Sequence, residues 1–303
     1  MALSNPDAIF NETWNYDGSS TGQASTETSE VLLKPVRIYR DGSTPCTYVL
    51  CESILADGTP ARGNTRALFP TEAADTWFGF EQEFFIEPIS DPPSADIMNA
   101  TPQGEFYCAV GGKMRQLTEE IVTKARAIGL GIAGWNLEVA PIQTEIQVFG
   151  PALRACDDLV MLRYLSYRLL ADHGCRPNYA PKPYSALNGS GLHTNVSTAT
   201  TRNTRDNNGL QEIHRLMTQF ANNHDDHIAN YGLGNEARLT GIHETSSLRE
   251  FSYSVGGRHT SVRIPRATEA AGGGYFEDRR PAANADPYRV GTAIIRTLTS
   301  AGN

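Results

Sequence analysis

Charged residues lie inside the most apolar segments of this chain, and this pattern constrains its fold more than any other. Residues 77–86, with the sequence WFGFEQEFFI, hold two carboxylates among aromatic and aliphatic side chains. Burying a charged group is costly unless the group is paired or binds a metal ion. We therefore expect the fold to gather several such groups around more than one hard cation. The candidates are five carboxylates and one imidazole: Glu81, Glu83, Glu138, Glu145, His193 and Glu277.

Alternation along residues 77–86 gives the first geometric expectation. Successive side chains of a strand point to opposite faces, so Glu81 and Glu83 share one face while Phe80 and Phe84 point towards a core. Neighbouring carboxylates repel and raise each other's pKa unless a cation lies between them. The alternative is an ordinary solvated strand face, because exposed strand faces are common.

A second pair of carboxylates flanks a predicted turn in residues 135–147, with the sequence WNLEVAPIQTEIQ. Pro141 suits a turn between two strands. If the strands pair as a hairpin, Glu138 and Glu145 can face each other across it. A shared cation would remove their repulsion, whereas two ordinary surface glutamates are the alternative interpretation.

A histidine follows a loop that contains two glycines. His193, Asn195 and Ser197 alternate along a predicted strand over residues 191–198, so they share one face. The glycines of the preceding loop, residues 188–191, let the backbone approach a ligand closely. A lone histidine is more often structural than a ligand, and this alternative stays open.

Arginines accompany these segments at Arg238, Arg258, Arg263 and Arg279. Guanidinium groups bind phosphate and carboxylate groups in a bidentate manner. Carboxylates that bind magnesium beside arginines that bind phosphate are the recurring equipment of phosphoryl transfer. Ion pairs with surface carboxylates are the alternative for each arginine taken singly.

The pattern of apolar residues predicts a mixture of helices and strands without a regular βαβ rhythm, which favours the α+β class. Strands are expected at residues 31–39, 46–54, 77–87, 191–198, 258–264 and 274–278, with a further pair around 130–149. Helices are expected at residues 116–128, 153–173 and 208–230, and after Asp286, an N-cap followed by Pro287 at the first helical position. On the helix at 153–173 the apolar residues are Leu153, Cys156, Val160, Tyr164, Tyr167 and Leu170.

Composition excludes several classes of protein. The chain has 303 residues and a formal net charge of −8 without a basic cluster, so nucleic acid is a poor candidate partner. No apolar run approaches the roughly 18 residues of a membrane helix, and residues 1–6 show no signal-peptide pattern. We therefore expect a cytoplasmic protein. Five cysteines without a Cys-x-x-Cys pair argue against a disulfide framework and a thiolate metal site.

Four motifs together resemble one known family. They are WFGFEQE at residues 77–83, NGSGLHTN at 188–195, RLTGIHET at 238–245 and GYFEDRRPA at 274–282. In this order and spacing they resemble glutamine synthetases of the type II, eukaryote-like class, and the resemblance extends over residues 14–287. It implies a small N-terminal β-grasp-like domain at residues 1–70 and a catalytic domain at residues 71–303. The catalytic domain would contain a curved, mostly antiparallel sheet.

The resemblance also implies roles for individual residues. One metal, nearer the substrate glutamate, would be held by Glu83, Glu138 and Glu145. A second metal, bridging the ATP phosphates, would be held by Glu81, His193 and Glu277. Substrate glutamate would be bound by Asn188, Gly189 and Arg238. The transferring phosphoryl group and the nucleotide phosphates would be stabilised by Arg258, Arg263 and Arg279.

The remaining roles concern the nucleotide and the ammonium ion. The nucleotide pocket would be formed by Trp77, Asn195, Ser197 and Tyr275. Asp17 would help to bind ammonium and remove its proton from a neighbouring subunit, and Glu244 would lie on a flap over the intermediate. The resemblance thus implies ATP, glutamate and ammonium as substrates and two or three Mg²⁺ or Mn²⁺ ions per site. It also implies a homo-oligomer, a decamer of two stacked pentameric rings.

The chain departs from the family pattern in places. Only 13 residues precede Trp14, so we expect an abbreviated N-terminal domain. Thr144 stands where the type II enzymes usually have Trp, and Ala237 replaces a common Arg. Three alternatives stay open: a γ-glutamyl ligase that uses another amine, a non-catalytic structural relative, and a two-metal hydrolase. The last does not account for the arginines or the His-Glu-Thr sequence.

Overall fold

The structure is a computed structural model that describes residues 6–42, 46–70, 75–94, 96, 98 and 112–300. The chain divides into two compact units. The smaller unit comprises Met1–Phe69 with Ala127–Gly129, and the larger comprises Pro70–Arg126 with Leu130–Asn303. Four cysteines in the described part of the chain, Cys46, Cys51, Cys156 and Cys175, form no disulfide bonds with one another, and Cys108 lies outside that part.

The smaller unit is built on a three-stranded antiparallel sheet in the order β1-β2-β3. Its strands are β1 (Trp14–Asp17), β2 (Glu30–Arg40) and β3 (Thr47–Ile54), with the 3₁₀ helices η1 (Pro6–Asn11) and η2 (Arg66–Leu68) beside them in the chain. The register between β2 and β3 shifts at Pro35, which lacks the N–H that a regular ladder needs. The strands predicted at 31–39 and 46–54 are confirmed.

The larger unit contains an eight-stranded sheet in the order β5-β6-β4-β8-β11-β10-β9, with β7 also paired to β4. Every pair is antiparallel except β9 with β10, which confirms the α+β class with a mostly antiparallel sheet. The strands are β4 (Trp77–Pro88), β5 (Ile132–Leu137), β6 (Gln143–Pro151), β7 (Cys175–Asn178), β8 (Leu192–Ser197), β9 (Tyr253–Val255), β10 (Val262–Ile264) and β11 (Phe276–Asp278).

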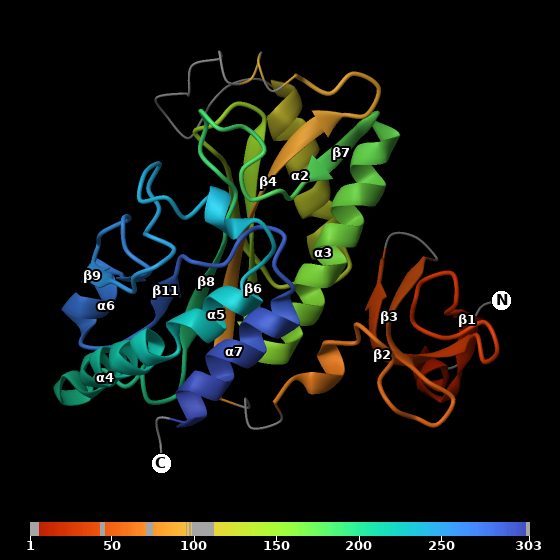
Figure 1. The fold of residues 1–303 in the computed structure, drawn as a ribbon, viewed down its shortest axis with the longest axis horizontal. Helices are drawn as coiled ribbons and strands as arrows, with labels where there is room; N and C mark the ends of the chain where they lie inside the picture. The colour runs from red at the N-terminus through yellow and green to blue at the C-terminus, as the bar shows by residue number, and fades with distance from the viewer. Residues whose placement is uncertain are drawn as a thin grey trace. The chain divides into compact units, whose positions relative to one another are not determined.

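Helices cover this sheet. Figure 1 shows α3 (Ala152–Asp172) running beside β4 and β7, with α7 (Pro287–Ser300) next to it. The helix α3 contacts β4, β6, β7 and α7, and α7 also contacts α4 and α5. The other helices are α2 (Gly112–Ala127), α4 (Asn208–Asn222), α5 (His224–Asn230) and α6 (Arg266–Ala271), with short 3₁₀ turns η4 (Arg205–Asn207) and η5 (Asn235–Ala237).

Two helix predictions differ from the structure. The helix expected at 208–230 is broken at Asn223, whose side-chain amide donates to the carbonyl of Gln219 at 2.9 Å and so competes with the helix ladder. On α3, Tyr164 and Tyr167 are about half exposed. A tyrosine combines an apolar ring with a polar hydroxyl and so suits a half-exposed position. The helix instead buries mainly small and aliphatic side chains: Ala155, Cys156, Leu159, Leu162, Leu165 and Leu170.

The start of the last helix is confirmed in detail. Asp286 Oδ1 accepts hydrogen bonds from the backbone N–H of Tyr288 at 2.8 Å and of Arg289 at 3.4 Å. This is the N-cap that the Asp-Pro sequence predicts. Across the part of the chain that the structure describes, the helices lack the length and apolarity needed to cross a membrane.

Candidate active site

Three neighbouring strands of the larger unit display four of the six predicted ligands on one face. Glu83 on β4 lies directly opposite Glu145 on β6. Glu81, two residues earlier, lies opposite Gln147 on β6 and opposite His193 on β8. The alternation predicted from residues 77–86 therefore brings residues from three distant segments into adjacent rows.

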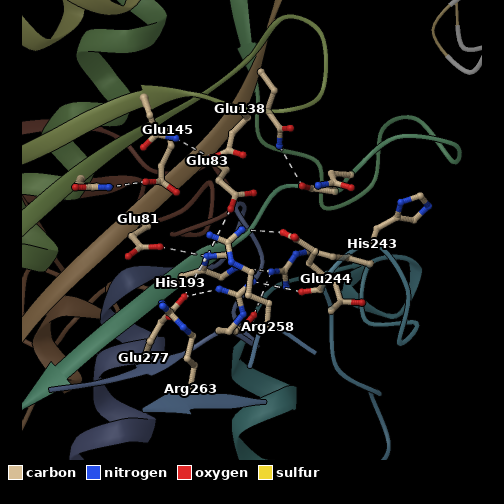
Figure 2. A pocket seen from close by; sticks show the side chains of 18 residues that line it. Glu81, Glu83, Glu138, Glu145, His193, His243, Glu244, Arg258, Arg263 and Glu277 are labelled. Atoms are coloured by element: carbon tan, nitrogen blue, oxygen red, sulfur yellow. Dashed lines mark hydrogen bonds and ion pairs between the residues drawn. The ribbon is translucent and has the colours of Figure 1, made fainter. Parts of the chain in front are cut away.

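These residues line a cavity of about 420 Å³. Figure 2 shows Glu81, Glu83, Glu138 and Glu145 along one side of it and His243 and Glu244 on another. The cavity is lined by Glu81, Glu83, Asn136, Glu138, Gln143, Glu145, Gln147, Asn188, Gly189, His193, Arg238, His243, Glu244, Thr245, Arg258, Arg263, Glu277 and Arg279.

One group of possible metal ligands comprises Glu83, Glu138 and Glu145, each offering a carboxylate oxygen within 4.8 Å of the others. The expectation that Glu138 faces Glu145 across a hairpin is wrong. Strand β5 ends at Leu137, and the residue opposite Glu145 is Asn136. Glu138 lies in the turn, where its N–H donates to Gln143 O at 3.0 Å. From the turn its carboxylate reaches those of Glu83 and Glu145.

The electrostatics of this group indicate a cation. Burial, together with the charge of Glu138, raises the pKa of Glu83 to about 8. Burial also raises the pKa of Glu138, and burial with the charges of Glu81 and Glu83 raises the pKa of Glu145 well above its usual range. A divalent cation would remove both the desolvation cost and the mutual repulsion. The oxygen donors suit Mg²⁺ or Mn²⁺.

A second group comprises Glu81, Glu145 and His193, again within 4.8 Å. His193 Nδ1 lies 3.3 Å from Glu81 Oε2 and 3.7 Å from Glu277 Oε1. Burial, with the charge of Arg279, lowers the pKa of His193 well below its usual range, so the imidazole is neutral, the form that binds metals. Glu277 lies beside this group rather than in it, and its membership of the second triad stays a prediction.

Several amide groups orient the carboxylates, and two of them were not foreseen from the sequence. Gln147 Nε2 donates to Glu145 Oε1 at 2.7 Å, and Asn136 Nδ2 donates to Glu138 Oε1 at 2.9 Å. Partners of this kind fix the ligand geometry in metal sites. Both could have been found from the sequence, because Gln147 alternates with Glu145 along a strand and Asn136 precedes Glu138 by two residues.

Arginine side chains line the same cavity as the carboxylates. Glu277 is held between Arg263 Nη1 at 2.9 Å and Arg279 Nη1 at 2.5 Å. Arg258 Nη1 donates to Glu244 Oε2 at 3.0 Å. The buried Nε atoms of Arg263 and Arg279 have no hydrogen-bond partner within the part of the chain that the structure describes. These guanidinium groups therefore keep donors for a further acceptor such as phosphate.

The loop that carries Glu244 has a strained backbone. His243 and Glu244 both adopt positive φ angles, 53° and 60°, which are unusual for residues other than glycine. The loop is pinned by Arg279 Nη2, which donates to Glu244 O at 3.3 Å, and by a bridge between Thr240 and Ser247. Strain of this kind gathers at functional sites, and the loop forms one rim of the cavity.

The predicted glutamate-binding residues lie together at one end. A Cβ atom on Gly189 would meet Pro181 O at 2.4 Å and Arg238 Cγ at 3.0 Å, so only glycine fits there. Arg238 is buried, and its guanidinium donates to the carbonyls of Arg279 and Arg280 and to His193 Nε2. Asn188 lines the same cavity.

A second cavity of about 330 Å³ adjoins the first, and the two share Glu81 and Gln147 in their walls. It is more aromatic than the first. All four residues predicted for the nucleotide pocket line it: Trp77, Asn195, Ser197 and Tyr275. Phe149, which the sequence analysis did not single out, also lines it.

Asp17 lies in the smaller unit, at the end of β1, and is fully exposed. Hydrogen bonds from the Ser19 and Ser20 hydroxyls and from the Ser19 N–H lower the pKa of Asp17 below its usual value. Among the described residues, those that line the two cavities belong to the larger unit. The role of Asp17 at a neighbouring subunit's site stays a prediction.

Comparison with known proteins identifies the family. A family profile described as "Glutamine synthetase, catalytic domain" matches residues 65–231. Over most of its length the chain is 44% identical to a glutamine synthetase of Neurospora crassa, covering 95% of this chain and 83% of the relative. The chain belongs to the glutamine synthetase family. It is therefore an enzyme of glutamine synthesis.

Other members of the family extend this result. Identity is 41% to "Glutamine synthetase 1, mitochondrial" of Drosophila melanogaster, over 94% of this chain and 75% of that protein. It is 40% to "Glutamine synthetase, chloroplastic" of Chlamydomonas reinhardtii, over 94% of this chain and 79% of that protein. Membership in the glutamine synthetase family implies the use of ATP, glutamate, ammonia and a divalent metal, which suits the two carboxylate groups of the first cavity.

Proposed function

We propose that the chain joins ammonia to the side-chain carboxylate of L-glutamate, with cleavage of ATP to ADP and phosphate through a γ-glutamyl phosphate. The observation that supports this most directly is the juxtaposition of buried carboxylates with raised pKa values and arginines with unused donors in one cavity. A pocket of this composition suits a reaction in which negative charge develops on a transferring phosphoryl group.

In the first step, a carboxylate oxygen of glutamate attacks the γ-phosphorus of ATP and ADP leaves. Asn188, Gly189 and Arg238 bind the glutamate, and Arg258, Arg263 and Arg279 donate to the phosphate oxygens. Glu83, Glu138 and Glu145 would hold one divalent cation, and Glu81, His193 and Glu277 another, with Mg²⁺ or Mn²⁺ as the ion. Bound metal supplies neutralisation of phosphate charge and alignment of the reacting oxygens.

In the second step, ammonia attacks the carbonyl carbon of the acyl phosphate and phosphate leaves. Asp17 of a neighbouring subunit and Glu244 accept the two protons that the nitrogen loses, one from ammonium before the attack and one from the nitrogen after it. The loop around Glu244 excludes water, because an acyl phosphate hydrolyses readily when water reaches it. The participation of Asp17 in another subunit's site requires a homo-oligomer, and two stacked pentameric rings is the assembly we propose.

The domain organisation and location are part of the same proposal. Residues 1–70 form a β-grasp-like domain that contributes Asp17, and residues 71–303 form the catalytic domain. We place the enzyme in the cytoplasm, whereas the names of two relatives assign them to the mitochondrion and the chloroplast.

The test is ADP release by the purified protein with Mg²⁺, measured with glutamate and ammonium supplied together and each omitted in turn. Release that depends on both supports the proposal, and its absence from an assembled protein contradicts it. Arg279→Ala should lower kcat by about 10²- to 10³-fold, as for loss of one preorganised charge donor. The matched control is Arg168→Ala, an exposed arginine on α3 that should retain full activity. Faster turnover with another amine than with ammonium would identify a different γ-glutamyl ligase.

A further inference from the structure

Phe149 is an exposed aromatic residue on a strand face that is otherwise occupied by the polar residues of the site. It follows Glu145 and Gln147 at alternate positions on β6, and its side chain is 50% exposed. Exposing a phenylalanine to water is unfavourable. Its position on the wall of the second cavity, 5.0 Å from the ring of Trp77, suggests that a ligand covers it.

The residue opposite Phe149 supports this reading. Gly79 on β4 pairs with Phe149 on one side and with Asn195 on the other. Its φ angle is not positive, so its backbone does not require glycine. A Cβ atom there would lie 3.3 Å from Asn195 Cβ and 3.8 Å from Phe149 Cδ2. Glycine inside a strand often marks a close approach by a ligand, and here it leaves a gap between Phe149 and Asn195.

The gap lies next to the predicted phosphate-binding region. Gly79 is two residues from Glu81, so its row is about 7 Å along β4 from the row of Glu81 and His193. The cavities share Glu81 and Gln147 in their walls, so they lie next to each other. A flat apolar group attached to a phosphate chain therefore fits the second cavity while its phosphates lie in the first.

We propose that Phe149 is a further nucleotide-binding residue, whose ring stacks on the base of the nucleotide above the open floor made by Gly79. This inference rests on the proposed function, because it takes the nucleotide to be the occupant of the two adjoining cavities. Stacking on an aromatic ring depends little on which base is present. Phe149 therefore contributes affinity, and hydrogen-bonding residues of the pocket such as Ser197 are left to select the base.

The test is equilibrium binding of ADP with Mg²⁺, followed by calorimetry, together with the KM values for ATP and glutamate. Phe149→Ala should weaken binding of ADP and raise the KM for ATP by about 5- to 150-fold, the range for loss of one base stack. The KM for glutamate and kcat at saturating ATP should not change. Inhibition by inorganic pyrophosphate, which has no base, should also not change.

Two further variants separate stacking from folding. Phe149→Tyr keeps the ring and should restore the affinity for ADP, whereas Phe149→Leu keeps apolar bulk against Trp77 and should not. Tyr164→Ala removes an aromatic ring of equal exposure, 50%, from α3 and should have no effect on ADP binding. If ADP binds Phe149→Ala as tightly as the wild-type protein, the inference is wrong while the proposed function stands. If the wild-type protein binds no nucleotide, both fail.

Discussion

Two sets of buried charges in the larger unit have opposite electrostatic environments. Asp278 and Arg280 are fully buried and lie 2.8 Å apart. Burial would raise the pKa of Asp278, but the charge and hydrogen bonds of Arg280 outweigh it and lower that pKa below its usual value. Glu83 is also buried, but burial and the charge of Glu138 together raise its pKa to about 8.

The difference lies in how completely each set is paired within the protein. Arg280 donates to Asp278, to His224 Nδ1 at 3.0 Å and to His227 Nδ1 at 2.7 Å, and three aromatic rings surround it. Arg279, the residue just before it in the chain, has no hydrogen-bond partner for its Nε among the residues that the structure describes. Buried charges that stabilise the fold therefore have their full set of partners within the protein. Those of the active site keep donors and acceptors that a ligand can use.

The largest expected effect comes from breaking the saturated pair. Asp278→Asn should lower the free energy of unfolding by about 3 to 5 kcal/mol, because it leaves Arg280 buried without its counter-charge. Urea unfolding of the metal-free protein at pH 8 measures this. The matched variant is Glu83→Gln, which removes a buried carboxylate by the same chemistry. It should cause no loss of stability, since it relieves repulsion between carboxylates. Equal losses in the two variants would show that the paired charges and the active-site charges do not differ in their contribution to stability.

The pH dependence of stability sharpens the same comparison. Between pH 6.5 and about 8, Glu83 is protonated in the folded protein and ionised in the unfolded chain. The stability of the metal-free protein therefore falls as pH rises, at most about 1.4 kcal/mol per pH unit for each such group. His193 and His227, whose pKa values are lowered by burial, contribute an increase only up to about pH 6.5.

Unfolding curves at several pH values, with and without Mg²⁺, test this prediction. Saturating Mg²⁺ should abolish the decline above pH 6.5, because bound metal keeps the carboxylates ionised in the folded state as well. Glu83→Gln should reduce the slope of the metal-free protein. If the free energy of unfolding of the metal-free wild-type protein did not change with pH above 6.5, the active-site carboxylates would not have raised pKa values.

A smaller effect is expected from the amides that orient the ligands. Gln147→Leu removes the hydrogen bond to Glu145 and should lower metal affinity by about 10- to 100-fold. Titration with Mn²⁺ measures the affinity directly. Gln211→Leu, at an exposed position on α4, is the control and should bind Mn²⁺ as the wild-type protein does. Equal affinities of both variants would mean that Gln147 only fills space.

The smallest effect is expected at the surface. Arg168 and Asp172 form an ion pair on α3 at 2.7 Å, with both side chains more than half exposed. Water screens this pair, so Arg168→Ala should change the free energy of unfolding by less than about 0.5 kcal/mol. A larger loss in urea unfolding would show that pairing alone, without burial, decides how much a charge contributes.

The sequence predicted those parts of the structure that depend on local periodicity. The alternation of Glu81 with Glu83 gave the correct face of β4, and Asp286 gave the start of α7. Local pattern could not place Glu138, because a turn residue has no strand register. It also could not distinguish Arg279 from Arg280, since two adjacent arginines carry the same chemistry until the fold puts one in the cavity and the other in the core.

Helix breaks and exposed rings were missed for a related reason. The break at Asn223 depends on a side-chain amide that competes for a backbone carbonyl, which hydrophobic spacing does not report. Phe149 was missed because an apolar side chain is usually assigned to the core, although its alternation with Glu145 and Gln147 on β6 places its ring on their face of the strand. The roles that rest on the family resemblance, including those of Asp17 and Glu277, stay predictions.

The row arrangement on β6, β4 and β8 makes the site unusually sensitive to one class of genetic change. A single-residue insertion in any of these strands would turn every following side chain to the opposite face, so that ligands would enter the core and core residues the cavity. A two-residue insertion would restore the facing but displace a row by about 6.6 Å. A substitution removes one ligand at a time. A one-codon insertion between Gln143 and Phe149 would instead turn all the following side chains of β6 away from the cavity or into it together.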